Sequence, residues 1–169
     1  MAEMKNQPCP ICLKNGLTLR EEEIEVPHFG KVFVFSMTCT ECKYHKSDLE
    51  PAEKKEACKY TLEVDSEDDM NVKIVKSSEA IIKIPHVITI ESGPASDGYI
   101  TNVEGLLERV KKAIEGAVDE DDDSSRKKAK NMIKKLNKVI FGKEKLKIIL
   151  EDPSGNSAII SDKAVKSKL

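Results

Sequence analysis

Two short stretches decide the fold: Cys9–Gly16, "CPICLKNG", and Cys39–His45, "CTECKYH". Each stretch places two thiols two residues apart, which lets the backbone curl so that both sulfurs face one point. Two such knuckles together supply four sulfurs in a tetrahedral array at about 2.3 Å from a zinc ion. The spacing therefore predicts one structural Zn²⁺ ion with four Cys ligands: Cys9, Cys12, Cys39 and Cys42. Four protein ligands leave no open position for a substrate, so the ion is expected to do no chemistry.

The segment between the two cysteine pairs has a β pattern. Apolar and charged residues partly alternate from Leu17 to Glu25, and residues 27–30, "PHFG", form a turn signal. Residues 31–39, "KVFVFSMTC", are rich in β-formers and lead back to the second pair. Residues 1–8 are interpreted as a short polar lead. Two knuckles joined by a β-hairpin predict a zinc ribbon.

Cysteine usage and compartment favour a metal site over a disulfide framework. The chain has five cysteines, an odd number, and its start, "MAEMKNQPCP", lacks the apolar core of a signal peptide. No run approaches the length of a membrane span. We therefore expect a cytoplasmic protein with reduced thiols. An iron-binding redox module of rubredoxin type remains an alternative, because it uses the same ligand set.

Charge argues for a protein partner rather than nucleic acid. Charged residues make up 34% of the chain, yet the net charge is only −2, whereas nucleic-acid binders normally show a basic excess. A nucleic-acid-binding zinc ribbon in transcription or translation stays open as an alternative, because the first module has some basic character. That character comes from Lys14, Arg20, Lys31, Lys43 and Lys46.

Four apolar residues of the predicted hairpin are the candidates for partner binding. They are Phe29, Val32, Phe33 and Phe35. A hairpin this small has room for few buried side chains, so some of these are expected to form a contact face.

The polar stretch 48–56, "DLEPAEKKE", places a boundary after residue 49. Residues 1–49 are predicted to be the zinc-ribbon finger and residues 50–169 a β domain. Within the β domain, strands are expected at 59–64, in "VKIVKS" (72–77) and in "EAIIKIPHVITIE" (79–91), and a loop at 91–101. This spacing is typical of a β-sandwich or barrel. The stretch "EKLKIILED", a "DPSG" turn and "NSAIISD" predict a closing hairpin.

A helical hairpin is predicted at about 103–141, inserted between strands. Apolar residues recur there at three- and four-residue intervals in two stripes, and Ser124 or Ser125 suits the N-cap of the second helix. The stripes are Leu106, Leu107, Val110, Ala113, Ile114 and Ala117, then Ala129, Met132, Ile133, Leu136 and Ile140. The fold class is therefore mostly β with an α-helical hairpin.

Nothing in the sequence predicts an enzyme. No Gly-rich phosphate loop with Lys and no Gly-x-Ser-x-Gly elbow is present, and the turn 152–157 explains Ser154 without a nucleophile. The acidic clusters at 65–69 and 119–123 are interpreted as solvated turns. Cys58 lies outside the ligand set, as a small buried hydrophobe or a free thiol.

Five stretches, in order, resemble four motifs of the ZPR-type zinc-finger family, with the two knuckles counted as one motif. They are the two knuckles, "DDMNVKIVKSSEAIIKIP" (68–85), "GYITNVEGLLERV" (98–110) and "EDPSGNS" (151–157). The likeness extends from about residue 6 to 160. It implies one zinc finger followed by a double-stranded β-helix domain with two inserted antiparallel helices. Eukaryotic members carry two such modules, so this chain resembles the shorter archaeal type.

The resemblance also implies a function. Family members bind the alpha subunit of translation elongation factor one and assist its folding, and some bind the cytoplasmic part of a growth-factor receptor kinase. For this chain we expect a non-catalytic chaperone or assembly factor for that translational GTPase.

Overall fold

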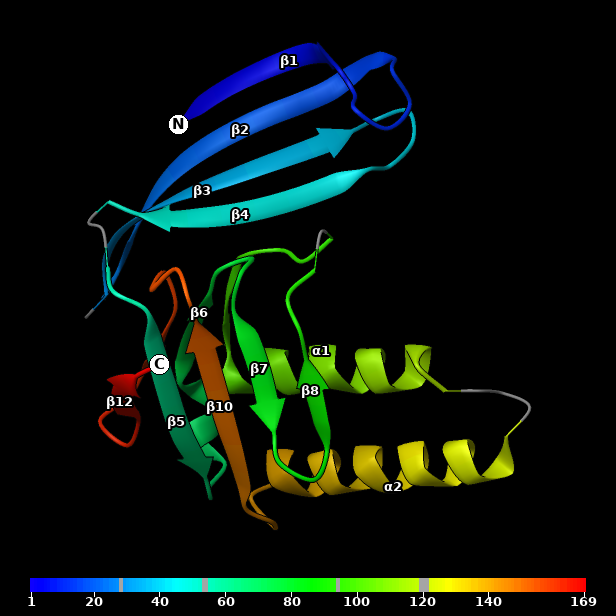
Figure 1. Cartoon of the computed structure of the whole chain (residues 1–169), viewed down its shortest axis with the longest axis vertical. Coiled ribbons are helices and arrows are strands. Elements are labelled where there is room, and N and C mark those ends of the chain that lie inside the picture. Colours follow the sequence, from blue (N-terminus) through cyan, green and yellow to red (C-terminus); the bar gives the residue numbers. More distant parts are fainter. Residues whose placement is uncertain (28, 53–54, 94, 119–121) are drawn as a thin grey trace.

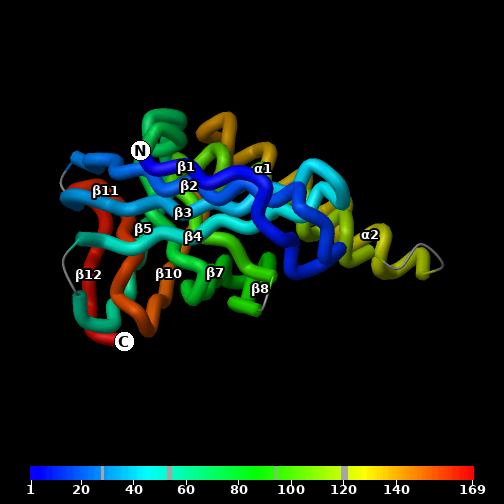
Figure 2. Tube along the Cα trace, turned by 90° about the horizontal axis from the view of Figure 1, so that it is seen from above, coloured from blue at the N-terminus to red at the C-terminus, as the bar shows by residue number. Residues whose placement is uncertain are grey.

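The computed structural model describes residues 1–27, 29–52, 55–93, 95–118 and 122–169. Within these residues the chain forms a four-stranded antiparallel sheet stacked on a second β unit, with two helices running beside the second unit (Figure 1). Figure 2, viewed from above, shows the first sheet lying across the rest of the molecule. No helix in the described part of the chain is long and apolar enough to cross a membrane.

The first sheet holds the finger, in the strand order β1-β2-β3-β4. Its strands are β1 (Ala2–Pro8), β2 (Asn15–Val26), β3 (Gly30–Cys39) and β4 (His45–Pro51). Residues 2–8 are thus an edge strand rather than a polar lead. Strand β4 ends two residues beyond the predicted division after residue 49, and the division itself stays a prediction. Strands β2 and β3 pair in one register from Leu17–Cys39 to Val26–Gly30.

Alternation along β3 gives the finger sheet two different faces. Val32 and Val34 point to one face, and Phe33 and Phe35 to the other, because successive side chains of a strand alternate. Val32 is wholly buried in a cluster with Val26 and Leu49 of the finger and Val75 of the second β unit. This inner face therefore packs against the rest of the protein, while the outer face is turned to solvent.

The second β unit consists of two facing sheets. Their strand orders are β12-β5-β10-β7-β8 and β11-β6-β9. The strands are β5 (Cys58–Val64), β6 (Lys73–Lys76), β7 (Ile81–Ile84), β8 (Ile88–Ile90), β9 (Tyr99–Asn102), β10 (Leu146–Asp152), β11 (Ala158–Ile160) and β12 (Val165–Lys168). The short 3₁₀ helix η1 (Asp68–Asn71) follows β5. The mostly β class with an N-terminal finger is confirmed.

Two details of the predicted β unit are wrong. The "DPSG" turn joins β10 to β11, but β10 pairs with β5 and β7 whereas β11 pairs with β6, so the chain crosses between sheets instead of closing a hairpin. The segment 91–101, predicted as a loop, ends in the first residues of β9. In both places the chain passes from one sheet to the other. The local pattern of apolar residues indicates a strand but not which strand it pairs with, so these crossings could not be predicted.

Helices α1 (Val103–Gly116) and α2 (Asp123–Ile140) cover one side of the sheets. The side chain of Asn102 accepts from the N–H of Gly105 at the start of α1. Asp122, rather than Ser124 or Ser125, caps α2, since its side chain accepts from the N–H of Ser124. The two apolar stripes enter one aliphatic core with β5, β7 and β10. Residues 119–121 of the predicted acidic turn lie outside the described residues.

Polar contacts tie strand β4 of the finger to the second unit. The N–H of Ser47 donates to Asp97, and the hydroxyl of Ser78 donates to Asp48. The N–H of Gly98 donates to the carbonyl of Ser47 at 3.0 Å. A Cβ at Gly98 would lie 2.8 Å from a carboxylate oxygen of Asp48, so the two backbones approach as closely as they do because residue 98 is glycine.

The acidic cluster at 65–69 is not simply a solvated turn. Asp69 is 5% exposed and accepts from Lys163 near the C-terminus at 2.8 Å. Burial alone raises the pKa of Asp69, but the N–H groups of Asp65 and Ser66 and the ammonium of Lys163 outweigh it and lower the pKa from 3.8 to about 2. The pair holds the C-terminal segment against η1.

We predict that Asp69→Asn lowers the free energy of unfolding at pH 7 by about 2 kcal/mol. Because the folded-state pKa is below the ordinary value, the contribution of the carboxylate is complete above about pH 4 and is lost as the pH falls toward 2. Urea denaturation of both proteins between pH 7 and pH 3 measures the difference, of which roughly half should remain at pH 3. The control is Asp68→Asn. A difference that does not depend on pH would contradict the role of the charge.

Candidate metal centre

The two cysteine knuckles have the same local structure. In each knuckle the residue after the second cysteine has a left-handed backbone, with φ of 61° at Leu13 and 63° at Lys43. The N–H of Leu13 donates to the carbonyl of Cys9, and that of Lys43 to Cys39. This repeated turn bends each Cys-x-x-Cys segment back on itself and points its two sulfurs to the same side.

Pairing of β2 with β3 brings the knuckles together. The N–H of Thr40 donates to the carbonyl of Gly16 at 3.0 Å. A Cβ on Gly16 would lie 2.8 Å from the side chain of Glu41, so a larger residue would push the knuckles apart. Beneath them Leu17 packs with Cys9 and Cys39 in a small core.

The four sulfurs lie within 4.8 Å of one another. The Sγ atoms of Cys9 and Cys42 are 3.7 Å apart, and those of Cys12 and Cys39 are 3.8 Å apart. A tetrahedron with zinc–sulfur bonds of about 2.3 Å has edges of about 3.8 Å. Cys9 and Cys39 are buried, whereas Cys42 is exposed. The cluster is consistent with one closed Zn²⁺ site.

The electrostatics of the cluster also fit a cation. Burial opposes ionisation of Cys9, but the N–H groups of Cys12 and Ile11 lower its pKa to about 7. At Cys42 the N–H of Tyr44 favours the thiolate, yet desolvation and the three neighbouring sulfurs raise its pKa to about 12. Cys9 therefore loses its proton readily, whereas ionising Cys42 beside the other sulfurs is unfavourable. A divalent cation among the sulfurs removes that repulsion.

The fifth cysteine is outside this cluster. Cys58 is buried at the start of β5, and its Sγ donates to the carbonyl of Ser157 at 3.5 Å. Burial raises the pKa of this thiol, with the carboxylate of Asp152 adding to the effect. Cys58 is thus a buried, neutral thiol, in agreement with its interpretation as a small hydrophobe.

The four candidate partner residues fall in different environments. Val32 is a core residue of the inner face, and its side chain has no exposed surface for a partner to contact. Phe33 is half-buried and Phe35 is 37% exposed, both on the outer face. Phe29 lies in the β2–β3 turn, over the second β unit.

The outer face also carries residues that sequence reasoning missed. Met4 of β1 pairs in register with Leu19, and Leu19 with Met37. Together with Phe35 these side chains line a groove of about 320 Å³, which we call the outer groove. The alternation of Phe33, Phe35 and Met37 along β3 could have indicated an apolar outer face. The contribution of Met4 could not be seen, because residues 1–8 were not predicted to form a strand.

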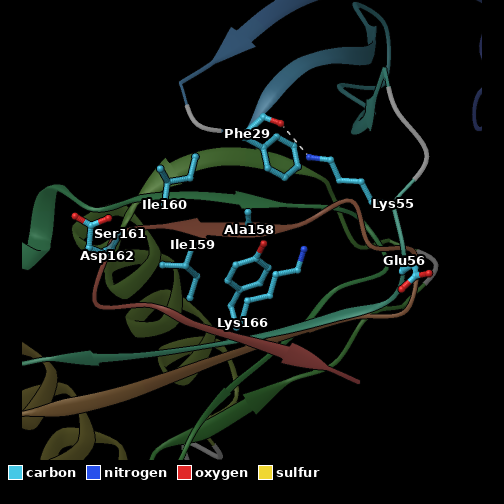
Figure 3. A pocket seen from close by; sticks show the side chains of 10 residues that line it. Phe29, Lys55, Glu56, Ala158, Ile159, Ile160, Ser161, Asp162 and Lys166 are labelled. Atoms are coloured by element: carbon cyan, nitrogen blue, oxygen red, sulfur yellow. Dashed lines mark hydrogen bonds between the residues drawn. The ribbon is translucent and has the colours of Figure 1, made fainter.

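Phe29 borders a separate cleft between the finger turn and the second β unit (Figure 3). The cleft has a volume of about 790 Å³ and is bounded below by Tyr60, Lys166 and strand β11. Lys55, in the segment between β4 and β5, also borders the cleft. Its Nζ lies 3.3 Å from the centre of the Phe29 ring and 3.0 Å from the Phe29 carbonyl oxygen. The turn is therefore held to the segment that joins the two β units.

Several basic residues of the finger are paired with carboxylates. Arg20 binds Glu3 at 2.8 Å and Lys31 binds Glu23 at 2.7 Å, while Lys14 lies 3.7 Å from Glu41. Such pairs leave little unbalanced positive charge for a phosphate backbone. The ribbon face is therefore poorly suited to the nucleic-acid alternative.

Comparison with known proteins identifies the family. Residues 3–57 match the family model described as the ZPR1 zinc-finger domain, and residues 68–168 match the ZPR1 jelly-roll domain. The chain belongs to the ZPR1 family. The resemblance is thereby confirmed, with one copy of each domain. We call residues 68–168 the jelly roll below.

The relatives differ in length. An uncharacterised ZPR1-like protein of Methanocaldococcus jannaschii is 36% identical over 165 residues, covering 96% of this chain and 83% of the relative. A similar protein of Pyrococcus horikoshii is 34% identical, covering 99% and 78%. The zinc finger chaperone zpr1 of Schizosaccharomyces pombe is 31% identical over 160 residues, but the match covers only 33% of that protein against 89% of this chain.

We predict that Cys39→Ser lowers bound zinc from one equivalent per chain to none and unfolds the finger, because metal binding supplies the folding free energy of such small modules, roughly 10 kcal/mol or more in isolated fingers. Elemental analysis and near-ultraviolet circular dichroism measure the two effects.

The matched control is Cys58→Ala, which should keep one equivalent of zinc. Unchanged zinc content in Cys39→Ser would remove Cys39 from the ligand set. A visible absorption band with bound iron in the wild-type protein would instead support the rubredoxin-type alternative.

Proposed function

We propose that this protein is a non-catalytic chaperone whose zinc ion, held by Cys9, Cys12, Cys39 and Cys42, shapes a docking surface for a protein partner. The observation that carries the proposal is the outer groove. It is apolar, it lies on the face turned away from the jelly roll, and its strands end in the zinc knuckles. Exposed apolar grooves of this kind mark protein-interaction sites.

The zinc ion acts on the groove through the register of the hairpin. Leu17 packs against the ligands Cys9 and Cys39, and Leu19 and Met37 join the same small cluster. Because Leu19 and Met37 also line the groove, the metal centre and the docking surface share side chains. Loss of the ion would release the pairing of β1, β2 and β3 at the end where the groove lies.

Phe35 and the two methionines suit a partner that presents varied apolar segments. Methionine side chains are flexible and polarizable, so they adapt to different shapes. Met4 is 56% exposed and Phe35 is 37% exposed, which leaves them available for contact. Binding an incompletely folded conformer more tightly than the native one shifts the partner's equilibrium by the difference in affinity alone, with no need for nucleotide hydrolysis.

The partner we propose is the alpha subunit of translation elongation factor one, in the cytoplasm. Support comes from the family membership, from the relative whose name includes the word chaperone, and from the motif resemblance. The fungal relative is much longer than this chain, so the assignment concerns the single module present here. We also propose two further contacts: Phe29, at the cleft between the finger turn and the second β unit, and Phe33, on the same face as the outer groove.

We predict that the double variant Met37→Ser, Phe35→Ser binds the elongation factor at least about tenfold more weakly, since two partly exposed apolar side chains each contribute roughly 1 kcal/mol or more to such an interface. The measurement is suppression of light scattering when the denatured elongation-factor subunit is diluted into buffer with the zinc-loaded chain.

Val165→Ser is the matched control, because Val165 is 64% exposed on β12 and is not part of the outer groove. Zinc content should stay at one equivalent in both variants. Equal suppression by the double variant and the wild type would show that the outer groove is not the docking surface.

A further inference from the structure

Helix α2 concentrates positive charge in a chain whose net charge is −2. Its 18 residues contain seven basic side chains against one acidic one, Asp123. The basic residues are Arg126, Lys127, Lys128, Lys130, Lys134, Lys135 and Lys138. The near balance of the whole chain therefore hides a strongly basic element.

Four of these lysines form one row, which we call the lysine stripe: Lys127, Lys130, Lys134 and Lys138. At 3.6 residues per turn these positions lie on one side of the helix. The opposite side carries Ala129, Leu136 and Val139, which are buried in the aliphatic core. All four lysines are exposed, so the stripe faces solvent.

The stripe makes few ion pairs. Among the described residues its one ion pair joins Lys138 to Glu144 at 3.7 Å, while Asp123 at the N-terminal end of the helix pairs with Arg126 outside the stripe. Some lysines elsewhere are paired, as Lys111 is with Glu108 on α1 and Lys163 with Asp69. Like charges four residues apart destabilise a helix by about 0.2–0.5 kcal/mol per pair. An external polyanion would relieve this repulsion.

The spacing of the stripe suits a phosphate backbone. From Lys127 to Lys138 the helix rises by about 16 Å, at 1.5 Å per residue. A nucleic-acid duplex carries one phosphate charge per about 1.7 Å of its axis when both strands are counted, so each of the four ammonium groups has a phosphate of one strand or the other nearby. The carboxylates of a folded acidic protein have no such dense and regular repeat.

A membrane surface fits less well, and sequence-specific recognition of bases is not expected either. A helix that lies on a membrane inserts its apolar face into the lipid, but the apolar face of α2 is already packed in the core. Lysine ammonium groups are point charges without the planar fork by which arginine reads guanine, so the stripe has no means of selecting a base sequence.

We propose that α2 binds the phosphodiester backbone of nucleic acid through the lysine stripe, without sequence preference. This surface is distinct from the zinc ribbon, whose basic residues are largely paired. It is also independent of the outer groove, so the chaperone proposal and this one stand or fall separately.

The test measures fluorescence anisotropy of labelled 20-nucleotide mixed-sequence RNA and DNA, single-stranded and duplex, with the zinc-loaded full chain. Four phosphate contacts predict a slope of log affinity against log salt of about −3.6 for duplex DNA and about −2.8 for single strands. Raising salt from 50 to 200 mM should then weaken binding by about 150-fold and about 50-fold. Binding that ignores salt would overturn the proposal.

The decisive variant changes all four stripe lysines to glutamine, which removes like-charge repulsion and so does not threaten the helix. It should lose the salt-dependent binding while still suppressing aggregation of the elongation factor. The matched control changes four exposed lysines elsewhere to glutamine: Lys5, Lys73, Lys147 and Lys168. This control has the same net charge and should bind within about threefold of wild type.

Equal weakening in both variants would overturn the proposal, because it would trace binding to net charge rather than to α2. A polyglutamate chain of matched charge serves as competitor. If it displaced the wild-type protein as well as unlabelled oligonucleotide does, the stripe would be a site for acidic protein segments instead.

Discussion

The rest of the structure depends on a cation placed among four sulfurs at one end of the β2–β3 hairpin. Four thiolates in close contact repel one another, and a divalent cation among them removes that repulsion. The apolar cluster beneath is small, built on Leu17 and two of the ligands themselves. The opposite end of the hairpin needs no metal, because Val26 and Val32 are buried against Val75 of the jelly roll. The finger is thus fixed at one end by a metal and at the other by packing.

This double attachment gives the finger sheet its two faces. The inner face packs on the jelly roll, and hydrogen bonds of β4 hold it there. Ser47 is hydrogen-bonded to Asp97 and Gly98, and Asp48 to Ser78. The outer face has no such covering and keeps Phe35 and Met4 exposed. Since the side chains alternate, a shift of one residue in the register of β3 would exchange Val32 with Phe33 and expose the wrong set. A metal that fixes the register therefore also fixes which residues a partner meets.

The sequence predicted the parts whose signals are local, and missed those that depend on a distant partner. Cysteine spacing indicated the metal cluster, and apolar periodicity located both helices. Strands β1 and β12 were missed because they are polar edge strands, held by backbone pairing rather than by an apolar face. Burial of Asp69 was missed because its partner Lys163 lies far along the chain. Val32 and Phe35 look alike in the sequence, and only the position of the jelly roll decides which one is buried.

Net charge does not describe a single surface, since it averages over ion pairs that only the fold reveals. Several basic residues of the finger have carboxylates beside them, whereas among the described residues the ion pairs of α2 are those of Arg126 and Lys138. The two surfaces are also anchored differently: the outer groove shares side chains with the metal cluster, while α2 is held by the aliphatic core of the jelly roll. Figure 1 places strands β1, β2 and β3 and helix α2 at opposite ends of the molecule. The two proposals together assign an apolar client to the metal-dependent end and a polyanionic scaffold to the other. The two contacts do not compete for the same surface, so their affinities can be changed separately.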